Sequence, residues 1–392
     1  MIQTLALREH EAREVALREH DVSFLQEHFR HVIVVRPTTR PGRYELKAKA
    51  IAGTIVGPSL ELRIRPKCGL RNLFGMLSHV HHLAKLRPEL VHQAEDEDLR
   101  DLLVLILVQH LEALVRGGLR RGYVEDEARL PVLRGRLALD QQLRTMPGGT
   151  LTIACRYEDY TADLPLNQVI GYTLSQIEGT GSPQLDQRVR RSKAAFARLT
   201  PRRFRPSDLD QFTYDRLNAH YEVIHGICRL ILQARGAEDG PGALPMGSFL
   251  VNMNTLFQEF VAIWLDRNLP GPWRVRAQGS HSLDRQGQIK ILPDLLLYHD
   301  RELRLVADTK YKLCRGKASS EDLYQALAYC RALRVRSAVL LFPDIDGRHL
   351  HLVVADGANE LLTDGVDLAW PWAEVEAGMQ PLMTRLLELA KG

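Results

Sequence analysis

Residues 289–312 constrain the fold of this chain most strongly, because apolar strand patterning and charged residues coincide there. Two runs rich in Leu, Ile and Val, residues 289–298 and 303–312, flank a polar turn at residues 300–302. Apolar runs of this length on both sides of a polar turn are typical of a β-hairpin. We therefore predict two paired strands here, with the turn centred on Arg301.

The predicted hairpin gathers three charged side chains. Folding it about Arg301 brings Asp294 across from Asp308, and the alternation of side chains along a strand places Lys310 on the face of Asp308. Facing carboxylates repel each other unless a cation neutralises them, and a hard divalent ion such as Mg²⁺ suits such a pair. Lys310 would then orient a water molecule or stabilise negative charge developing on a phosphate. The alternative is a surface hairpin whose charges are solvated.

A helix is predicted on each side of the hairpin. Upstream, residues 254–268 are amphipathic, with Glu259 at the margin of the apolar face, where it would add a third carboxylate. Downstream, Gln325 and Tyr329 lie four residues apart on a predicted helix at 321–333 and so share a face. The plain structural alternatives are an exposed helix carboxylate for Glu259 and a buried phenol for the other pair.

The order of these residues resembles a known nuclease superfamily. The Pro-Asp pair ending at Asp294, followed by the Asp-x-Lys ending at Lys310, resembles the PD…(D/E)xK motif of metal-dependent nucleases. Gln325-x-x-x-Tyr329 resembles the QxxxY element of their RecB-like branch, and the predicted order of elements is the αβββαβ core that the superfamily implies. The resemblance implies metal binding by Asp294, Asp308 and Glu259, and a catalytic site made of Asp294, Asp308, Lys310, Glu259, Gln325 and Tyr329.

Further motifs along the chain make the resemblance closer. The chain is similar to the McrC family, the nuclease subunits of McrBC-type modification-dependent (type IV) restriction systems. The likeness extends over nearly the whole length. The motifs that carry it are Pro66-Lys67-Cys68-Gly69, Asn72-Leu73-Phe74, Leu133-Arg134-Gly135-Arg136-Leu137, Cys155-Arg156-Tyr157, Leu166-Asn167-Gln168 and Asn252-Met253-Asn254-x-Leu256-Phe257-x-Glu259-Phe260, together with the nuclease motif.

This resemblance implies a partner and a reaction. The expected partner is McrB, an AAA+ GTPase that forms a hexameric ring, and the expected activity is Mg²⁺-dependent endonucleolytic cleavage of double-stranded DNA with modified cytosine. The family places GTP on the partner, and this sequence agrees, because it contains no G-x-x-x-x-G-K-[ST] loop for nucleotide phosphates. The family also implies that an N-terminal β-rich part contacts the ring, and the exposed basic turn at residues 37–43 is one candidate.

Composition bounds the class of protein. The five cysteines form no C-x-x-C pair and are odd in number, which favours reduced thiols in a cytoplasm over a disulfide framework, a zinc site or an iron–sulfur cluster. The net charge of +4 is too small for a global polycation, so a DNA-binding surface must be local. The apolar run at residues 102–108 is bounded by charged residues and is predicted to be a buried helix, so no membrane span is expected.

The predicted fold class is α+β and multidomain: an N-terminal β-rich domain, a helical middle region and a C-terminal α/β nuclease domain of the PD-(D/E)xK (restriction-endonuclease-like) type. At 392 residues, two or three domains are expected. The predicted ranges are 1–150 for the β-rich and helical part that binds the partner, 151–240 for a mainly helical connection, and 245–392 for the nuclease. The Gly- and Pro-rich residues 235–247 are the best candidate for a linker.

Two points stay open at this stage. Arginines and a lysine concentrate between residues 188 and 205, and they form either a solvated helix face or a contact surface for DNA phosphates. The chain could also act without cleaving, as an activator or scaffold of the GTPase ring, or could act alone as a RecB-like DNA-repair nuclease.

Overall fold

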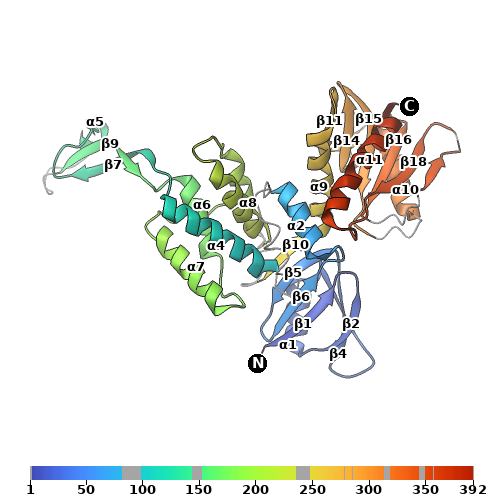
Figure 1. Cartoon of the computed structure of the whole chain (residues 1–392), viewed down its shortest axis with the longest axis horizontal. Coiled ribbons are helices and arrows are strands. Elements are labelled where there is room, and N and C mark those ends of the chain that lie inside the picture. Colours follow the sequence, from blue (N-terminus) through green and yellow to red (C-terminus); the bar gives the residue numbers. More distant parts are fainter. Residues whose placement is uncertain are drawn as a thin grey trace. The chain divides into compact units, whose positions relative to one another are not determined.

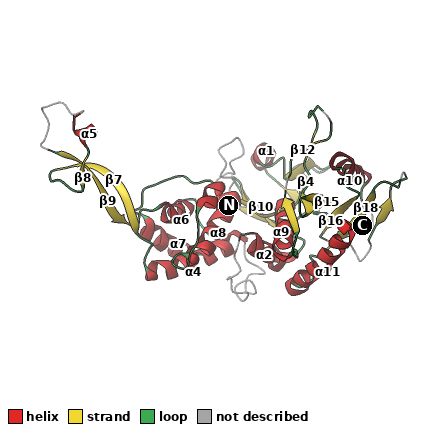
Figure 2. Ribbon diagram, turned by 90° about the horizontal axis from the view of Figure 1, so that it is seen from above, coloured by secondary structure: helices red, strands yellow, loops and turns green. Residues whose placement is uncertain are grey.

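The fold of the chain mixes helices with several sheets (Figures 1 and 2). Two compact units make up the chain: one combines residues 1–102 with 239–392, and the other spans residues 103–238. The mixed α+β, multidomain architecture that the sequence predicted is therefore confirmed. The computed structural model describes residues 2–81, 99–143, 152–234, 248–277, 279–284, 286–312, 318–343, 349–355 and 357–391.

The first unit begins with two small sheets. One has the strand order β1-β6-β5-β10 and the other β2-β4-β3, and the side chains of Leu25, Phe29 and Leu46 in their shared core are fully buried. The β-rich character predicted for this part is confirmed. The elements are β1 (Gln3–Arg8), β2 (Ala12–Ala16), α1 (Glu19–His28), β3 (Ile33–Pro37), β4 (Arg43–Ala48), β5 (Ile51–Val56), β6 (Leu60–Arg65) and β10 (Phe249–Asn252).

The fourth strand of the first sheet comes from far along the chain. β10 pairs antiparallel with β5, so that Phe249 lies opposite Thr54 and Leu250 opposite Gly53. A Cβ atom on Gly53 would lie 2.1 Å from the carbonyl oxygen of Phe249, and the φ of +131° also favours glycine there. The N-terminal sheet is therefore completed by residues inside the range predicted for the nuclease domain.

A six-stranded mixed sheet forms the C-terminal part of the same unit. Its order is β11-β14-β15-β16-β18-β17; β15, β16 and β18 are parallel, and the remaining neighbours pair antiparallel. A separate pair joins β12 to β13. The strands are β11 (Trp273–Ala277), β12 (His281–Ser282), β13 (Lys290–Ile291), β14 (Leu295–His299), β15 (Glu302–Thr309), β16 (Ser337–Phe342), β17 (His351–Val353) and β18 (Glu360–Gly365).

Four helices accompany this sheet. α9 and α11 contact β15, α10 packs on β15 and β16, and α2 packs against α9 (Figure 1). The succession α9, β11, β14, β15, α10, β16 follows the order that the sequence predicted, with two short strands added. The last of these helices, α11, contains Pro381 and continues through it. The helices are α2 (Gly69–Val80), α9 (Met253–Asn268), α10 (Ser320–Leu333) and α11 (Trp372–Lys391).

The predicted hairpin is present as β14 and β15, with a correction to each arm: the second was expected to extend to residue 312, whereas β15 ends at Thr309. Its first arm was expected to run without interruption from residue 289 to 298, whereas the structure divides it into β13 and β14. Pro293 lies in the gap, and a residue without an N–H cannot donate to a ladder. The turn follows the prediction, because His299 pairs with Glu302 and Asp300 adopts a positive φ of 55°.

The second unit is a helical layer with a small sheet of order β7-β9-β8. The helical character of this unit was predicted from the sequence. Most of its sheet was not predicted, because the side chains of β7 are exposed on both faces and the strand therefore has no apolar stripe. The elements are α4 (Leu99–Gly117), which starts in the first unit, β7 (Gly122–Leu130), β8 (Arg136–Leu137), α5 (Leu139–Leu143), β9 (Ile153–Thr161), α6 (Pro165–Ser175), α7 (Pro183–Phe196), the 3-10 helix η1 (Pro206–Gln211) and α8 (Ala219–Ala234).

The basic stretch lies on α7 and the segment after it. Arg188 forms two hydrogen bonds with the carboxylate of Glu112, at 2.8 and 2.9 Å, so this arginine has a structural role. Several others are exposed, and both alternatives for them stay open: Arg190, Arg191, Arg198, Arg202 and Arg203.

Two further predictions concern the linker and membrane-spanning helices. The predicted linker at residues 235–247 lies outside the described residues. None of the helices in the described ranges combines the length and the apolar content that crossing a membrane requires.

Candidate active site

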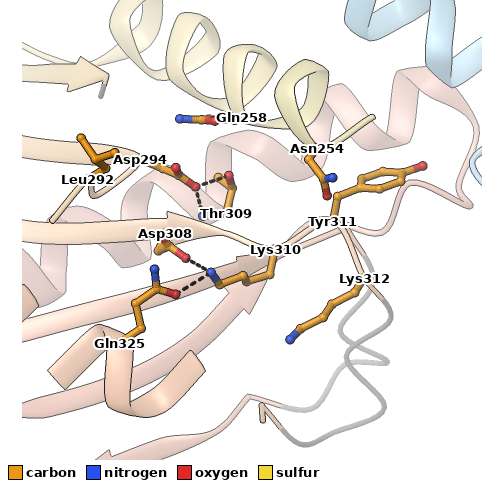
Figure 3. A pocket seen from close by; sticks show the side chains of 10 residues that line it. All are labelled: Asn254, Gln258, Leu292, Asp294, Asp308, Thr309, Lys310, Tyr311, Lys312 and Gln325. Carbon is orange, nitrogen blue, oxygen red and sulfur yellow. Dashed lines mark hydrogen bonds and ion pairs between the residues drawn. The ribbon is translucent and has the colours of Figure 1, made fainter. Parts of the chain in front are cut away.

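A cavity of about 340 Å³ opens where β14 begins and β15 ends, inside the first unit (Figure 3). By the register of the two strands, Leu295 pairs with Ala307, so Asp294 and Asp308 occupy the next opposing positions. Their side chains lie on the same face of the sheet as those of Leu296 and Val306, which pack against α10. The residues that line the cavity are Asn254, Gln258, Leu292, Asp294, Asp308, Thr309, Lys310, Tyr311, Lys312 and Gln325.

Asp308 and Lys310 form the central ion pair of the cavity. The Nζ of Lys310 lies 2.5 Å from the Oδ2 of Asp308 and donates a hydrogen bond of 2.8 Å to the Oε1 of Gln325 (Figure 3). The Asp308 side chain is 6% exposed and that of Lys310 20%, so solvent screens this pair weakly. The predicted convergence of this lysine with this carboxylate is present in the structure.

Gln325 and Tyr329 hold the ammonium of Lys310 in place. Because an ammonium can only donate, the oxygen of the Gln325 amide must face Lys310, and its Nε2 then donates to the hydroxyl of Tyr329 at 2.7 Å. That hydroxyl donates in turn to the carbonyl of Leu292 at 3.4 Å. The spacing of four residues on α10 thus builds a chain of hydrogen bonds that ends on the lysine.

Asp294 is fixed by the strand opposite it. Its Oδ2 accepts from the backbone N–H of Thr309 at 2.8 Å and from the hydroxyl of the same residue at 2.6 Å. Both bonds use one carboxylate oxygen, so Thr309 orients Asp294. In the sequence, Thr309 is only the middle residue of the Asp-x-Lys motif. A sequence pattern does not show a hydrogen bond from one strand to an aspartate opposite it.

The electrostatics of the cavity favour a bound cation. Burial and, next, the charge of Asp294 raise the pKa of the Asp308 carboxyl to about 6, although Lys310 lowers it. Burial also raises the pKa of Tyr329 to about 12, so its hydroxyl stays protonated. Two neighbouring carboxylates repel each other when both are ionised, and their ligand atoms are oxygens. Such a pair suits a hard divalent ion. Asp294 and Asp308 therefore fit the Mg²⁺ that the nuclease resemblance implies.

The third predicted ligand, Glu259, does not line this cavity. α9 contributes Asn254 and Gln258 instead, which lie four residues apart and so share a helix face that excludes Glu259. Within the described ranges, no group of three or more His, Cys, Asp or Glu side chains is placed to hold a metal ion. The expectation of a third carboxylate from Glu259 is therefore not supported by its position.

Comparison with protein families decides the class of the chain. Residues 46–343 match the family model described as the McrBC 5-methylcytosine restriction system component. The chain belongs to this family. The matched range includes every residue of the predicted nuclease motif.

Solved structures are also similar to the chain. One is a chain from a refined half-complex of a tetradecameric assembly of Thermococcus gammatolerans McrB AAA+ hexamers with bound McrC. It is 18% identical with a TM-score of 0.64, and the match covers 98% of the present chain and 100% of the other. Another, from the McrBC complex of the same organism, is 19% identical with a TM-score of 0.47 over 69% and 89% of the two chains. Curated proteins gave no match.

One further basic group of this McrBC-family protein was missed by sequence reasoning. Lys312 lines the cavity, and its Nζ pairs with the buried carboxylate of Asp322 on α10. The same carboxylate lies 4.0 Å from Lys310. Lys312 occurs in the strand run predicted from the sequence, but periodicity alone does not show that α10 brings Asp322 beneath it.

Proposed function

We propose that this McrBC-family chain is the DNA endonuclease subunit of a GTP-dependent restriction complex specific for modified cytosine. The observation that carries the proposal is the gathering of Asp294, Asp308 and Lys310 in one cavity, with Lys310 in contact with Asp308 at 2.5 Å. Opposed carboxylates beside an ammonium are suited to hydrolysis of a phosphodiester. The order of α9, β11, β14, β15, α10 and β16 supports assignment to the PD-(D/E)xK superfamily.

The residues divide into ligands and positioning groups. Asp294 and Asp308 would hold Mg²⁺, which when bound supplies Lewis-acid polarisation of the phosphate and a lower pKa for bound water. Lys310 donates hydrogen bonds and would orient the attacking water or stabilise charge on a phosphate oxygen. Gln325 and Tyr329 hold the ammonium of Lys310, and Thr309 holds Asp294.

The proposed partner is an McrB-like AAA+ GTPase hexamer, acting with this chain on double-stranded DNA in the cytoplasm. Family membership and the fold shared with a chain of the McrB–McrC assembly support this partner. GTP would bind to the partner, since this sequence has no phosphate-binding loop. The turn at residues 37–43 connects β3 with β4, and its arginines 40 and 43 lie 3.7 and 3.8 Å from Glu14. It stays a candidate contact with the ring.

The test uses the full chain assembled with its GTPase. Asp294→Asn and Lys310→Met should each lower the rate of cleavage of methylated DNA by on the order of a thousandfold, while GTP hydrolysis by the complex is retained. Asp300→Asn on the hairpin turn and Lys290→Met on β13 are matched controls outside the cavity, and they should cleave normally. Cleavage at the normal rate by either cavity variant would exclude the assignment.

The two alternatives predict different results in the same assay. A non-cleaving activator would stimulate GTP hydrolysis although the unmodified complex leaves the DNA intact. A stand-alone RecB-like repair nuclease would cut DNA at the full rate without GTP or the GTPase.

A further inference from the structure

We propose that the amide of Gln258 is the third protein ligand of the divalent ion, in place of a third carboxylate; this inference rests on the proposed function. Gln258 lines the cavity together with Asp294 and Asp308. Figure 3 shows the amides of Gln258 and Asn254 on the α9 side, and Asp308 and Gln325 on the other. The helix thus faces the carboxylates with neutral oxygen donors.

The start of α9 sets which side chains face the cavity. Asn252 caps the helix, because its Oδ1 accepts from the N–H groups of Asn254 and Thr255 at 3.0 and 3.3 Å. With the first turn held in this way, positions 254 and 258 lie one above the other and both reach the cavity. Glu259 is rotated about 100° away around the helix axis.

The Gln258 amide lacks a partner of its own. Its Nε2 is buried, and no hydrogen-bond partner for it exists among the residues that the structure describes. A buried amide nitrogen without a partner is unfavourable. The two ends of an amide have nearly the same shape, so turning it over is sterically neutral and exchanges the positions of Oε1 and Nε2. An amide oxygen is a normal ligand for a hard divalent ion.

The charge of the site allows a neutral third ligand. Asp294 and Asp308 already balance the two positive charges of the ion, and Lys310 lies beside Asp308. In the cavity without the ion, a third carboxylate would add to the repulsion between Asp294 and Asp308. An amide completes the coordination without that repulsion, and it leaves the ion less tightly bound than three carboxylates would.

The test is Mn²⁺ binding by the full chain, measured by electron paramagnetic resonance without DNA. Gln258→Ala should weaken binding on the order of tenfold, and Gln258→Glu should strengthen it by a similar factor because it adds a charge. Asp266→Asn removes an exposed carboxylate from the same helix and is the control that should bind normally. If Gln258→Ala does not fold by circular dichroism, the result for Gln258→Glu decides.

Two further variants separate the possible failures. If both Gln258 variants bind like the unmodified chain while Asp308→Asn loses the ion, the ligand assignment is wrong and the proposed function stands. If Asp308→Asn also binds normally, the proposed metal site itself is wrong. If Glu259→Gln weakens binding and Gln258→Ala does not, Glu259 is the third ligand, which overturns the inference.

Discussion

Of the two aspartates that line the cavity, Asp308 is the more deeply buried. The side chain is 6% exposed, faces Asp294 and contacts Lys310. Since burial and Asp294 raise its pKa from 3.8 to about 6, the metal-free fold keeps a proton on Asp308 up to a higher pH than the unfolded chain does. By linkage, Asp308 stabilises the fold most below pH 4 and loses that contribution, about 3 kcal/mol at most, as the pH rises from about 4 to 6.

Metal binding should show the opposite pH dependence. A proton on Asp308 competes with the ion, so Mn²⁺ affinity should rise about tenfold per pH unit below pH 6 and level off above it. Titration calorimetry between pH 5 and 8 measures this, and Asp308→Asn should bind weakly at every pH. An affinity of the unmodified chain that does not change between pH 5 and 7 would contradict the assigned role of Asp308.

Gln325 should affect catalysis without affecting metal binding. It contacts Lys310 and Tyr329 rather than the carboxylates, so Gln325→Leu should lower cleavage about 10–100-fold and leave Mn²⁺ affinity unchanged. Gln325→Glu keeps an acceptor for the ammonium and should restore much of the rate. Normal cleavage by Gln325→Leu, or loss of metal binding, would show that this amide does not act through Lys310.

At the scale of elements, α10 depends on its first residues. Ser319 is the N-cap: its hydroxyl accepts from the N–H of Asp322 at 3.2 Å and donates to the carboxylate of Asp322 at 2.6 Å. Ser319→Ala should therefore lower the free energy of unfolding by about 1 kcal/mol. The neighbouring Ser320→Ala is the control, since Ser320 is exposed and is not the cap. Urea denaturation that gives equal stability for both variants would show that the cap is not needed.

The sequence predicted the elements whose pattern is strong. The hairpin and the two helices beside it were found because apolar periodicity and turn residues agree there. It missed β2 and β5 because neither shows a clean alternation: β5 is buried on nearly every residue, and β2 is mostly exposed. The pentapeptide ALREH occurs twice, at residues 6–10 and 16–20, and its copies differ in structure, because the first ends β1 and the second runs from β2 into α1.

The sequence predicted those parts of the candidate site that depend on residue positions within one hairpin or one helix. Asp294, Asp308 and Lys310 follow from strand register, and Gln325 with Tyr329 follows from helical spacing. Thr309, Lys312 and Gln258 were missed because their roles depend on contacts between elements. Glu259 was predicted from its charge and its place at the margin of the apolar face, whereas the rotation of the helix determines which side chains line the cavity.

At the scale of the whole molecule, a buried contact joins the N-terminal sheets to the cavity. The hydroxyl of Tyr311, next to Lys310, donates to Glu9 at 2.7 Å, and the backbone N–H of Lys67 donates to the same oxygen at 2.6 Å. Glu9 is 2% exposed, and burial raises its pKa. Residues 302 positions apart thus share one buried polar cluster inside the first unit.

Removing that hydroxyl should destabilise the unit. Tyr311→Phe leaves a buried carboxyl group with one donor fewer, which should lower the free energy of unfolding by about 1–3 kcal/mol. Tyr324→Phe is the control, because Tyr324 is 72% exposed. Equal unfolding curves for the two variants would show that the cluster contributes nothing to stability.

The sequence could not show how the parts of the chain combine. The predicted ranges 1–150, 151–240 and 245–392 remain predictions, while the compact units join residues 1–102 with 239–392. β10 pairs with β5 although nearly two hundred residues separate them, and no local pattern reports such a pairing. A fragment of residues 1–150 would therefore lack a strand of its sheet, so the partner should be tested with the full chain.

The proposed cleavage activity depends on one divalent ion shared by Asp294 and Asp308 next to Lys310. Crystals of the full chain soaked in MnCl₂ would show the ion directly by its anomalous scattering. We expect one peak in the cavity within ligand distance of both carboxylates, about 2.0–2.6 Å. A cavity without a peak, or a peak bound to one carboxylate and not the other, would contradict the proposed site.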